Sequence, residues 1–248
     1  MNEWKTNSAN DDGFYPMNVS RQKLNSGQTA FTLIEMLVVI TIIAILAAVI
    51  VPLAGNIAAG QKLKRVQGEM AELETAIKSY ESARGHNPPD NPRDFAVPPL
   101  FYELTGTVYS ETGATPKIFR RIHGAEQITE ASAKAAFGVA GFVNSSYVQN
   151  PQSQDQIRES EVRDFLPDLK PAQYQQVNYA GQDVVVLGVP IDGPNDLSAS
   201  DGRKINPWHY NLSNPTNNPS SYDLWMDVII RGKTNRVCNW SEAPLIVN

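Results

Sequence analysis

A long apolar segment near the start of the chain constrains the fold more than any other feature. No charged side chain occurs in the 26 residues from Met36 to Gln61. Extended back to Phe31 and ended at Val51, the segment would form a helix of about 31 Å at about 1.5 Å per residue, which matches a bilayer core of about 30 Å. The apolar run is longer than the core of a secretory signal peptide, and no A-x-A cleavage site follows it. We therefore expect residues 31–51 to span a membrane rather than to form a signal peptide or a buried core helix.

Glu35 is an acidic residue inside this segment, and its presence needs an explanation. A carboxylate in a membrane helix costs about 2.5–3.5 kcal/mol at the helix centre and less near the end. Such groups usually have a partner of opposite charge. Proteolysis immediately before Phe31 would create an ammonium group about 6 Å from Glu35 along the helix, and the two charges would pair. The alternative is that Glu35 merely marks the edge of the membrane helix.

The sequence from Phe31 to Ile40, FTLIEMLVVI, resembles the prepilin signature of type IV pilins and type II secretion pseudopilins. The resemblance implies that a dedicated membrane peptidase cleaves between Ala30 and Phe31 on the cytoplasmic side and methylates the new amine of Phe31. It also implies that Glu35, the fifth residue of the mature chain, pairs with the amine of a neighbouring subunit during filament assembly. Members of this family commonly have a proline at the twenty-second mature position, which is Pro52 here.

The residue before the expected cleavage site departs from the family pattern. Glycine is strongly preferred there, and this chain has Ala30. Gly27 offers an alternative site before Gln28, but Glu35 would then be the eighth mature residue and the proline the twenty-fifth. The register of both landmarks therefore favours cleavage before Phe31, with residues 1–30 as a cytoplasmic leader.

A second helical pattern follows the apolar segment. Pro52 cannot donate a backbone hydrogen bond and should kink the helix. Beyond it, apolar residues recur at every third or fourth position, which is the spacing of one helix face; they are Leu63, Val66, Met70, Leu73, Ile77 and Tyr80. The pattern predicts an amphipathic continuation of the helix over residues 52–85, which ends at Arg84-Gly85.

Residues 86–248 should form a globular domain of short elements, because they contain 15 of the 17 prolines. The patterns predict helices over residues 98–104, 126–137 and 154–166, a strand over residues 183–191, and a hairpin formed by residues 222–230 and 235–240. The expected fold class is α+β, with the long N-terminal helix packed on a small antiparallel sheet. This is also the pilin-like fold that the resemblance implies.

The C-terminal region carries a second, looser resemblance, to the major, G-type pseudopilin. The segments INPWHY at 205–210, YDL at 222–224 and VCNW at 237–240 occur in the order found in that family. Residues 91–200 resemble no family pattern and suggest an expanded middle region. The calcium loop common in G-type pseudopilins is not expected here, because no carboxylate occurs between Asp227 and Trp240. A lone cysteine, Cys238, cannot form the disulfide common in type IVa pilins, which favours a pseudopilin.

The remaining residues argue against an enzyme, a metal site and a nucleic-acid-binding domain. The net charge is −5 and the pI is near 5.3, whereas nucleic-acid-binding proteins usually have a basic patch. His86, His123 and His209 are far apart, and no G-x-S-x-G motif occurs. The acidic residues between Asp155 and Asp164 alternate with arginines, as on a solvated helix face. We expect no catalytic residue, cofactor or bound metal.

The predicted function is that of a pseudopilin, a structural subunit of a type II secretion pseudopilus that crosses the inner membrane once. The resemblance places the N-terminus in the cytoplasm and the bulk of the chain outside. It implies as partners other copies of the chain, prepilin peptidase, an inner-membrane platform protein, minor pseudopilins and membrane lipid. Two alternatives remain: a type IV pilus pilin for adhesion, motility or DNA uptake, and a membrane-anchored binding module in which residues 91–200 recognise a ligand.

Overall fold

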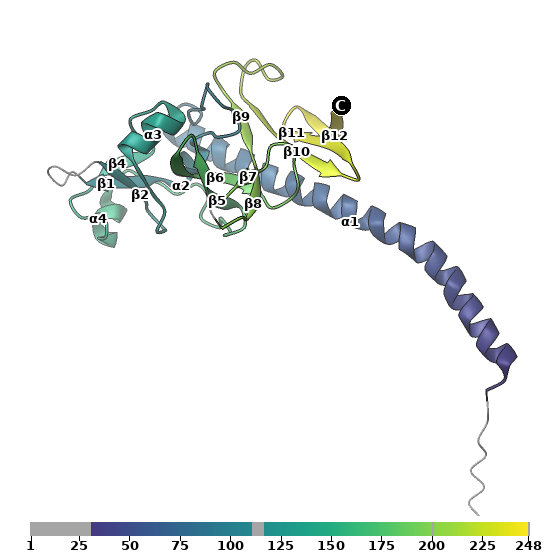
Figure 1. Cartoon of the computed structure of the whole chain (residues 1–248). Coiled ribbons are helices and arrows are strands. Elements are labelled where there is room, and N and C mark those ends of the chain that lie inside the picture. The colour runs from purple at the N-terminus through teal and green to yellow at the C-terminus, as the bar shows by residue number, and fades with distance from the viewer. Residues whose placement is uncertain (1–30, 111–116, 200, 248) are drawn as a thin grey trace, which may run out of the picture. The chain divides into compact units, whose positions relative to one another are not determined.

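The computed structural model describes residues 31–110, 117–199 and 201–247, and the expected leader, residues 1–30, lies outside them. The chain divides into two compact units, Met1–Ile50 and Val51–Asn248. In its described part the first unit is helical, and all the described strands belong to the second unit (Figure 1).

Helix α1 (Leu33–Arg84) begins in the first unit. Among the described residues, Leu33–Ile50 is the one helical segment long and apolar enough to cross a membrane, with a mean hydropathy of 3.0. None of its side chains is buried. An apolar surface of this extent is not stable in water, so lipid or other apolar helices must cover it. The long apolar N-terminal helix that the sequence predicts is therefore confirmed.

The rest of α1 belongs to the second unit and is amphipathic. Val66, Ile77 and Tyr80 have no exposed surface and Leu73 is 5% exposed, while Leu63 and Met70 are partly buried against the same core. Every residue of the predicted stripe therefore faces the domain. The helix ends at Arg84, where Gly85 takes a left-handed conformation with φ of 81° and donates its N–H to the Glu81 carbonyl. Glycine adopts this conformation without the strain that a side chain would cause.

The described residues of the second unit form three four-stranded sheets. In the first sheet, with the order β3-β2-β1-β4, β1 and β4 are parallel and the other pairs are antiparallel; the strands are β1 (Thr107–Ser110), β2 (Ile118–Arg121), β3 (Gln127–Thr129) and β4 (Ser145–Tyr147). The second sheet is antiparallel with the order β5-β6-β8-β7: β5 (Tyr174–Tyr179), β6 (Gln182–Val189), β7 (Leu197–Ser198) and β8 (Lys204–Pro207). The third is antiparallel with the order β12-β11-β10-β9: β9 (His209–Asn211), β10 (Asp223–Ile230), β11 (Lys233–Cys238) and β12 (Ser241–Val247).

The sheets lie along the second half of α1 (Figure 1), and one hydrophobic core joins them to this helix. Its members come from the apolar stripe of α1, from strands of all three sheets, such as Phe119 on β2, Val186 on β6 and Leu224 on β10, and from two short helices, α2 (Leu100–Thr105) and α3 (Glu130–Phe137). A smaller cluster around Val108 and Ile157 lies beneath the fourth helix, α4 (Gln154–Glu159). The α+β class predicted from the sequence is confirmed, with three sheets in place of the single small sheet.

The predicted local elements agree with the structure to different degrees. The hairpin is confirmed as β10 and β11, which pair from Trp225 with Cys238 to Ile230 with Lys233. The predicted helix 126–137 is wrong at its start, because residues 127–129 pair with β2, and Thr129 then caps α3 by accepting the Ser132 N–H. The predicted helix 154–166 is wrong after Glu159. Beyond that residue the chain contacts α2 instead, because the Phe165 N–H donates to the carbonyl of Leu104 in α2 at 2.7 Å.

Candidate functional site

The start of α1 is organised by a reciprocal pair of hydrogen bonds between Thr32 and Glu35. The backbone N–H of Thr32 donates to Glu35 Oε2 at 2.8 Å, and the backbone N–H of Glu35 donates to Thr32 Oγ1 at 3.3 Å. The Thr32 hydroxyl also donates to Glu35 Oε2, at 2.7 Å. This is a capping box, in which each side chain satisfies a backbone donor that the first helical turn leaves free.

The capping box fixes where the Glu35 carboxylate points. Because it bonds to the N–H of Thr32, it is turned back toward the N-terminal end of the helix, where the helix dipole also favours a negative charge. Oε2 accepts both hydrogen bonds from Thr32, while Oε1 accepts none from any described residue. One oxygen thus remains available to a donor outside this chain segment.

The structure describes some of the predicted site residues and not others. Ala30 lies outside the described residues, so the expected scissile bond is not placed. Phe31 directly precedes the capping box, and its side chain is 68% exposed. Pro52 lies within α1, and a kink there remains a prediction. The capping role of Thr32 was not recognised from the sequence, although Thr-x-x-Glu before an apolar run is the known signature of a capping box.

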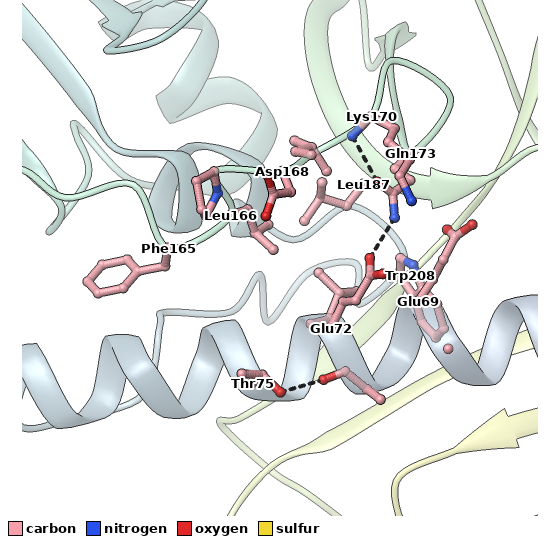
Figure 2. Close-up of a pocket in the computed structure, with 15 residues that line it drawn as sticks. Glu69, Glu72, Thr75, Phe165, Leu166, Asp168, Lys170, Gln173, Leu187 and Trp208 are labelled. Carbon is pink, nitrogen blue, oxygen red and sulfur yellow. Dashed lines mark hydrogen bonds between the residues drawn. The ribbon is translucent and has the colours of Figure 1, made fainter.

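The second unit contains a groove of about 440 Å³ beside α1. Its walls are one face of α1 from Gly68 to Thr75 and the segment from Phe165 to Gln173, with Leu187 and Trp208 at its base. Figure 2 shows Glu69 and Glu72 extending from α1 toward the Lys170–Gln173 part of that segment. The side-chain amide of Gln173 donates to Glu72 Oε2 at 3.0 Å and so ties the two walls together.

The C-terminal landmark residues meet in one hydrogen-bonded cluster. The Asn239 side chain accepts the Leu224 N–H at 3.0 Å and donates to the Tyr222 carbonyl, also at 3.0 Å. Asp223 is 2% exposed and accepts backbone N–H groups from three consecutive residues, Thr216–Asn218. These contacts close the loop between β9 and β10, which gives the landmarks a structural role.

His209, the histidine beside Trp208, is packed inside the domain. Its ring stacks on the Trp225 ring with a centroid distance of 5.0 Å, and burial lowers the pKa of the imidazole. Within the described ranges, no group of three or more His, Cys, Asp or Glu side chains is arranged to hold a metal ion.

Comparison with known proteins identifies the N-terminal segment. Residues 25–51 match the family model described as the prokaryotic N-terminal methylation motif. Over 56 residues, the chain is 41% identical to several sequences of the type IV major fimbrial protein FimA from Dichelobacter nodosus. The alignment covers 23% of this chain and 36% of the relatives, so the chain spans little more than a third of the length of the curated proteins it matches. No solved structure matches the chain.

Proposed function

We propose that this chain is a structural, non-catalytic subunit of a filament of the type IV pilin and pseudopilin class. The observation that carries the proposal is the start of α1, where Thr32 and Glu35 form a capping box in the first turn of an apolar helical segment whose side chains are all exposed. A simple membrane anchor has no need of a carboxylate held in one orientation. The methylation motif over residues 25–51, which includes Phe31 and Glu35, supports the same function.

Maturation creates the partner for Glu35. Prepilin peptidase cleaves between Ala30 and Phe31 and methylates the new amine, which remains positively charged. Glu35 Oε1, which accepts no hydrogen bond from a described residue, then accepts one from the ammonium group of a neighbouring copy. Charges attract far more strongly in apolar surroundings than in water, and an unpaired charge there is costly. Pairing therefore selects one register between neighbouring helices.

Assembly replaces lipid by protein around the apolar helix. In the monomer, the segment Leu33–Ile50 spans the inner membrane once, with the N-terminus in the cytoplasm and the second unit outside. In the filament, the same side chains pack against equivalent helices of other copies. Pro52 interrupts the backbone hydrogen bonding between the two regions of α1, which allows the helix to bend where it leaves the apolar core.

The type II secretion pseudopilus is the filament that the C-terminal region favours. The landmarks of the G-type pseudopilin include Tyr222, Leu224 and Asn239, which form a hydrogen-bonded cluster in this chain. A subunit of this kind works with an inner-membrane platform protein and minor pseudopilins. A type IV pilus is the second candidate, because the relatives of the N-terminal segment are named type IV major fimbrial proteins.

The first experiment is the intact mass and the N-terminal peptide of the protein purified from its native membranes. We expect N-methylphenylalanine at Phe31. A chain that starts at Gln28 would retain proteolytic maturation but overturn the register of Glu35. A chain that still starts at Met1 would refute the filament subunit and favour a membrane-anchored binding module.

The second experiment tests the role of Glu35 in assembly. Glu35→Ala should abolish filaments while the protein remains in the membrane, because the neighbouring ammonium group loses its partner. Glu81→Ala is the matched control, since it removes an exposed glutamate from the same helix far from the apolar segment. Electron microscopy of sheared filaments and the amount of membrane-bound monomer give the two readouts. Filaments of normal yield from Glu35→Ala would contradict the proposal.

A further inference from the structure

The groove beside α1 has the features of a docking site for a protruding segment. It is open to solvent, and Leu73, Leu166, Leu187 and Trp208 line its inner part. These side chains are nearly buried, so the floor is apolar and rigid. At about 440 Å³ the groove has room for the side chains of a turn, and it lies within the size range of sites that recognise ligands.

The rim of this groove is acidic. Three carboxylates line it, from Glu69, Glu72 and Asp168, against one ammonium group, that of Lys170. Glu69 Oε1 accepts a hydrogen bond from Arg65 Nε at 2.9 Å, but its buried Oε2 has no hydrogen-bond partner in the described part of the chain. Burial raises the pKa of the Glu69 carboxyl above its usual value. Glu69 is therefore nearly buried and already paired with Arg65, whereas Glu72 and Asp168 are exposed, so a further cation can approach these two carboxylates.

The chain carries a surface of the opposite character at the tip of the β10–β11 hairpin. Ile229, Arg231 and Lys233 are exposed there. No acidic residue occurs between Asp227 and Glu242, so the tip is cationic and partly apolar. This combination complements the acidic, apolar groove in both charge and polarity.

Besides its charge, the tip has an unusual backbone conformation at Arg231, which also indicates a role beyond folding. Arg231 and Gly232 form a two-residue turn with φ of 53° and 72°. Asparagine or glycine is the usual residue at the first position of such a turn, because a larger side chain is strained at positive φ. Within the described ranges, the Arg231 side chain forms no hydrogen bond or ion pair that would offset this strain.

We infer that the β10–β11 tip of one copy of this chain docks into the groove beside α1 of another copy. Arg231 and Lys233 face the carboxylates of the rim, and Ile229 contacts its apolar part. The tip and the groove share no residue, so a head-to-tail pair leaves a free groove on the copy that gave its tip and a free tip on the other copy. Such an interface propagates into an open filament rather than closing a dimer. The inference rests on the proposed filament function and adds to it a specific contact between the extracytoplasmic domains.

Disulfide cross-linking in the processed protein in its native membranes tests this contact. Asp168→Cys and Lys233→Cys in the same chain should give a ladder of covalent oligomers on mild oxidation, because every copy offers both partners. Either substitution alone should give dimers at most. Asp168→Cys with Ser198→Cys is the matched control, since Ser198 is an exposed residue of β7 and is not one of the tip residues. The native Cys238 is buried and does not interfere.

Charge reversal tests whether the rim and the tip recognise each other electrostatically. Arg231→Glu with Lys233→Glu should lower the filament yield at least about tenfold, because like charges that meet at an interface repel each other and disfavour docking. Adding Glu72→Lys and Asp168→Lys should restore the yield. If neither the ladder nor the rescue appears while wild-type filaments form and Glu35→Ala abolishes them, the docking inference is wrong and the filament function stands. If the wild-type chain is uncut and monomeric, the filament function fails and the docking inference fails with it.

Discussion

Glu103, a carboxylate that is 1% exposed, illustrates how single residues stabilise the second unit. It accepts hydrogen bonds from the Tyr80 hydroxyl and from the backbone N–H groups of Val143 and Asn144, each at 2.9 Å. These bonds connect α1, α2 and the loop before β4. Burial nevertheless dominates, and it raises the pKa of the Glu103 carboxyl above its usual value even though the three donors and Arg84 favour the charged form.

The raised pKa of Glu103 predicts a pH dependence of stability. The folded state binds this proton more tightly than the unfolded state, so the free energy of unfolding falls as the pH rises from the unfolded pKa, about 4.5, through the folded pKa. Glu103→Gln should remove this part of the decline, although it lowers stability overall because its amide opposes backbone donors. Denaturant titrations of both proteins in detergent, between about pH 4.5 and 7, measure the two slopes. Equal slopes would show that Glu103 does not titrate in this range.

Asp223 carries a different prediction, because its carboxylate closes the loop between β9 and β10. Asp223→Asn replaces one acceptor oxygen by an N–H₂ group that faces backbone donors of Thr216–Asn218. Hydrogen bonds to a charged group contribute about 1.5–3 kcal/mol each, so we expect a loss of about 3 kcal/mol. Asp201→Asn changes an exposed carboxylate paired with Arg203 and should cost far less, because water screens an exposed ion pair. Comparable losses in the two variants would contradict the buried role of Asp223.

Sequence patterns revealed some of these residues and concealed others. Thr32 and Glu35 are three positions apart, so their capping box can be recognised locally. Glu103 receives two of its donors from residues 40 and 41 positions further along the chain. Nothing near Glu103 distinguishes it from an exposed glutamate, and its role follows only from tertiary structure.

At the scale of elements, a long sequence pattern predicts a helix or strand more reliably than a short one. The stripe on α1 repeats over 18 residues from Leu63 to Tyr80, and its prediction is confirmed. The helix predicted over residues 154–166 ends at Glu159, because Phe165 donates its backbone N–H to the Leu104 carbonyl and not within a helix. Short strands such as β3 and β4 have three residues each and depend on partners rather than on their own sequence. The groove beside α1 escaped prediction because its two walls lie about 100 positions apart, as the bond between Glu72 and Gln173 indicates.

The β10–β11 turn offers a prediction at this scale that separates stability from assembly. Arg231→Asn places a residue suited to positive φ at the first turn position, so the free energy of unfolding should rise by about 1 kcal/mol. The same change removes a cation from the docking tip and should lower the filament yield. Lys204→Asn removes an exposed cation elsewhere and should change neither quantity. A stabilised Arg231→Asn protein with an unchanged filament yield would mean that the arginine has no part in assembly.

At the scale of the whole molecule, the two units differ in where their apolar side chains lie: they are exposed in the described part of the first unit and buried in a core in the second. The apolar part of α1 from Leu33 to Ile50 buries none of its side chains, whereas the core of the second unit is complete in itself. Every buried member of its main cluster lies between Val66 and Val237. Folding of the second unit therefore does not depend on the apolar helix, and the sequence indicated this division because the charge-free run ends before the amphipathic stripe begins.

This division predicts that residues 51–248 fold without the first unit. The fragment keeps all of α1 that contributes to the core, together with the three sheets, so it should be soluble without detergent and unfold in one cooperative transition. Without the apolar helix, the weak contact between tip and groove has no second contact to reinforce it, so the fragment should be monomeric at micromolar concentration. Ile77→Ala removes a side chain with no exposed surface and should destabilise the fragment by about 2–5 kcal/mol, whereas Lys78→Ala should have little effect. Circular dichroism during heating and analytical ultracentrifugation check both points. A fragment that melts without cooperativity would mean that the first 50 residues contribute to the fold, and the separation into an assembly helix and an independent domain would have to be abandoned.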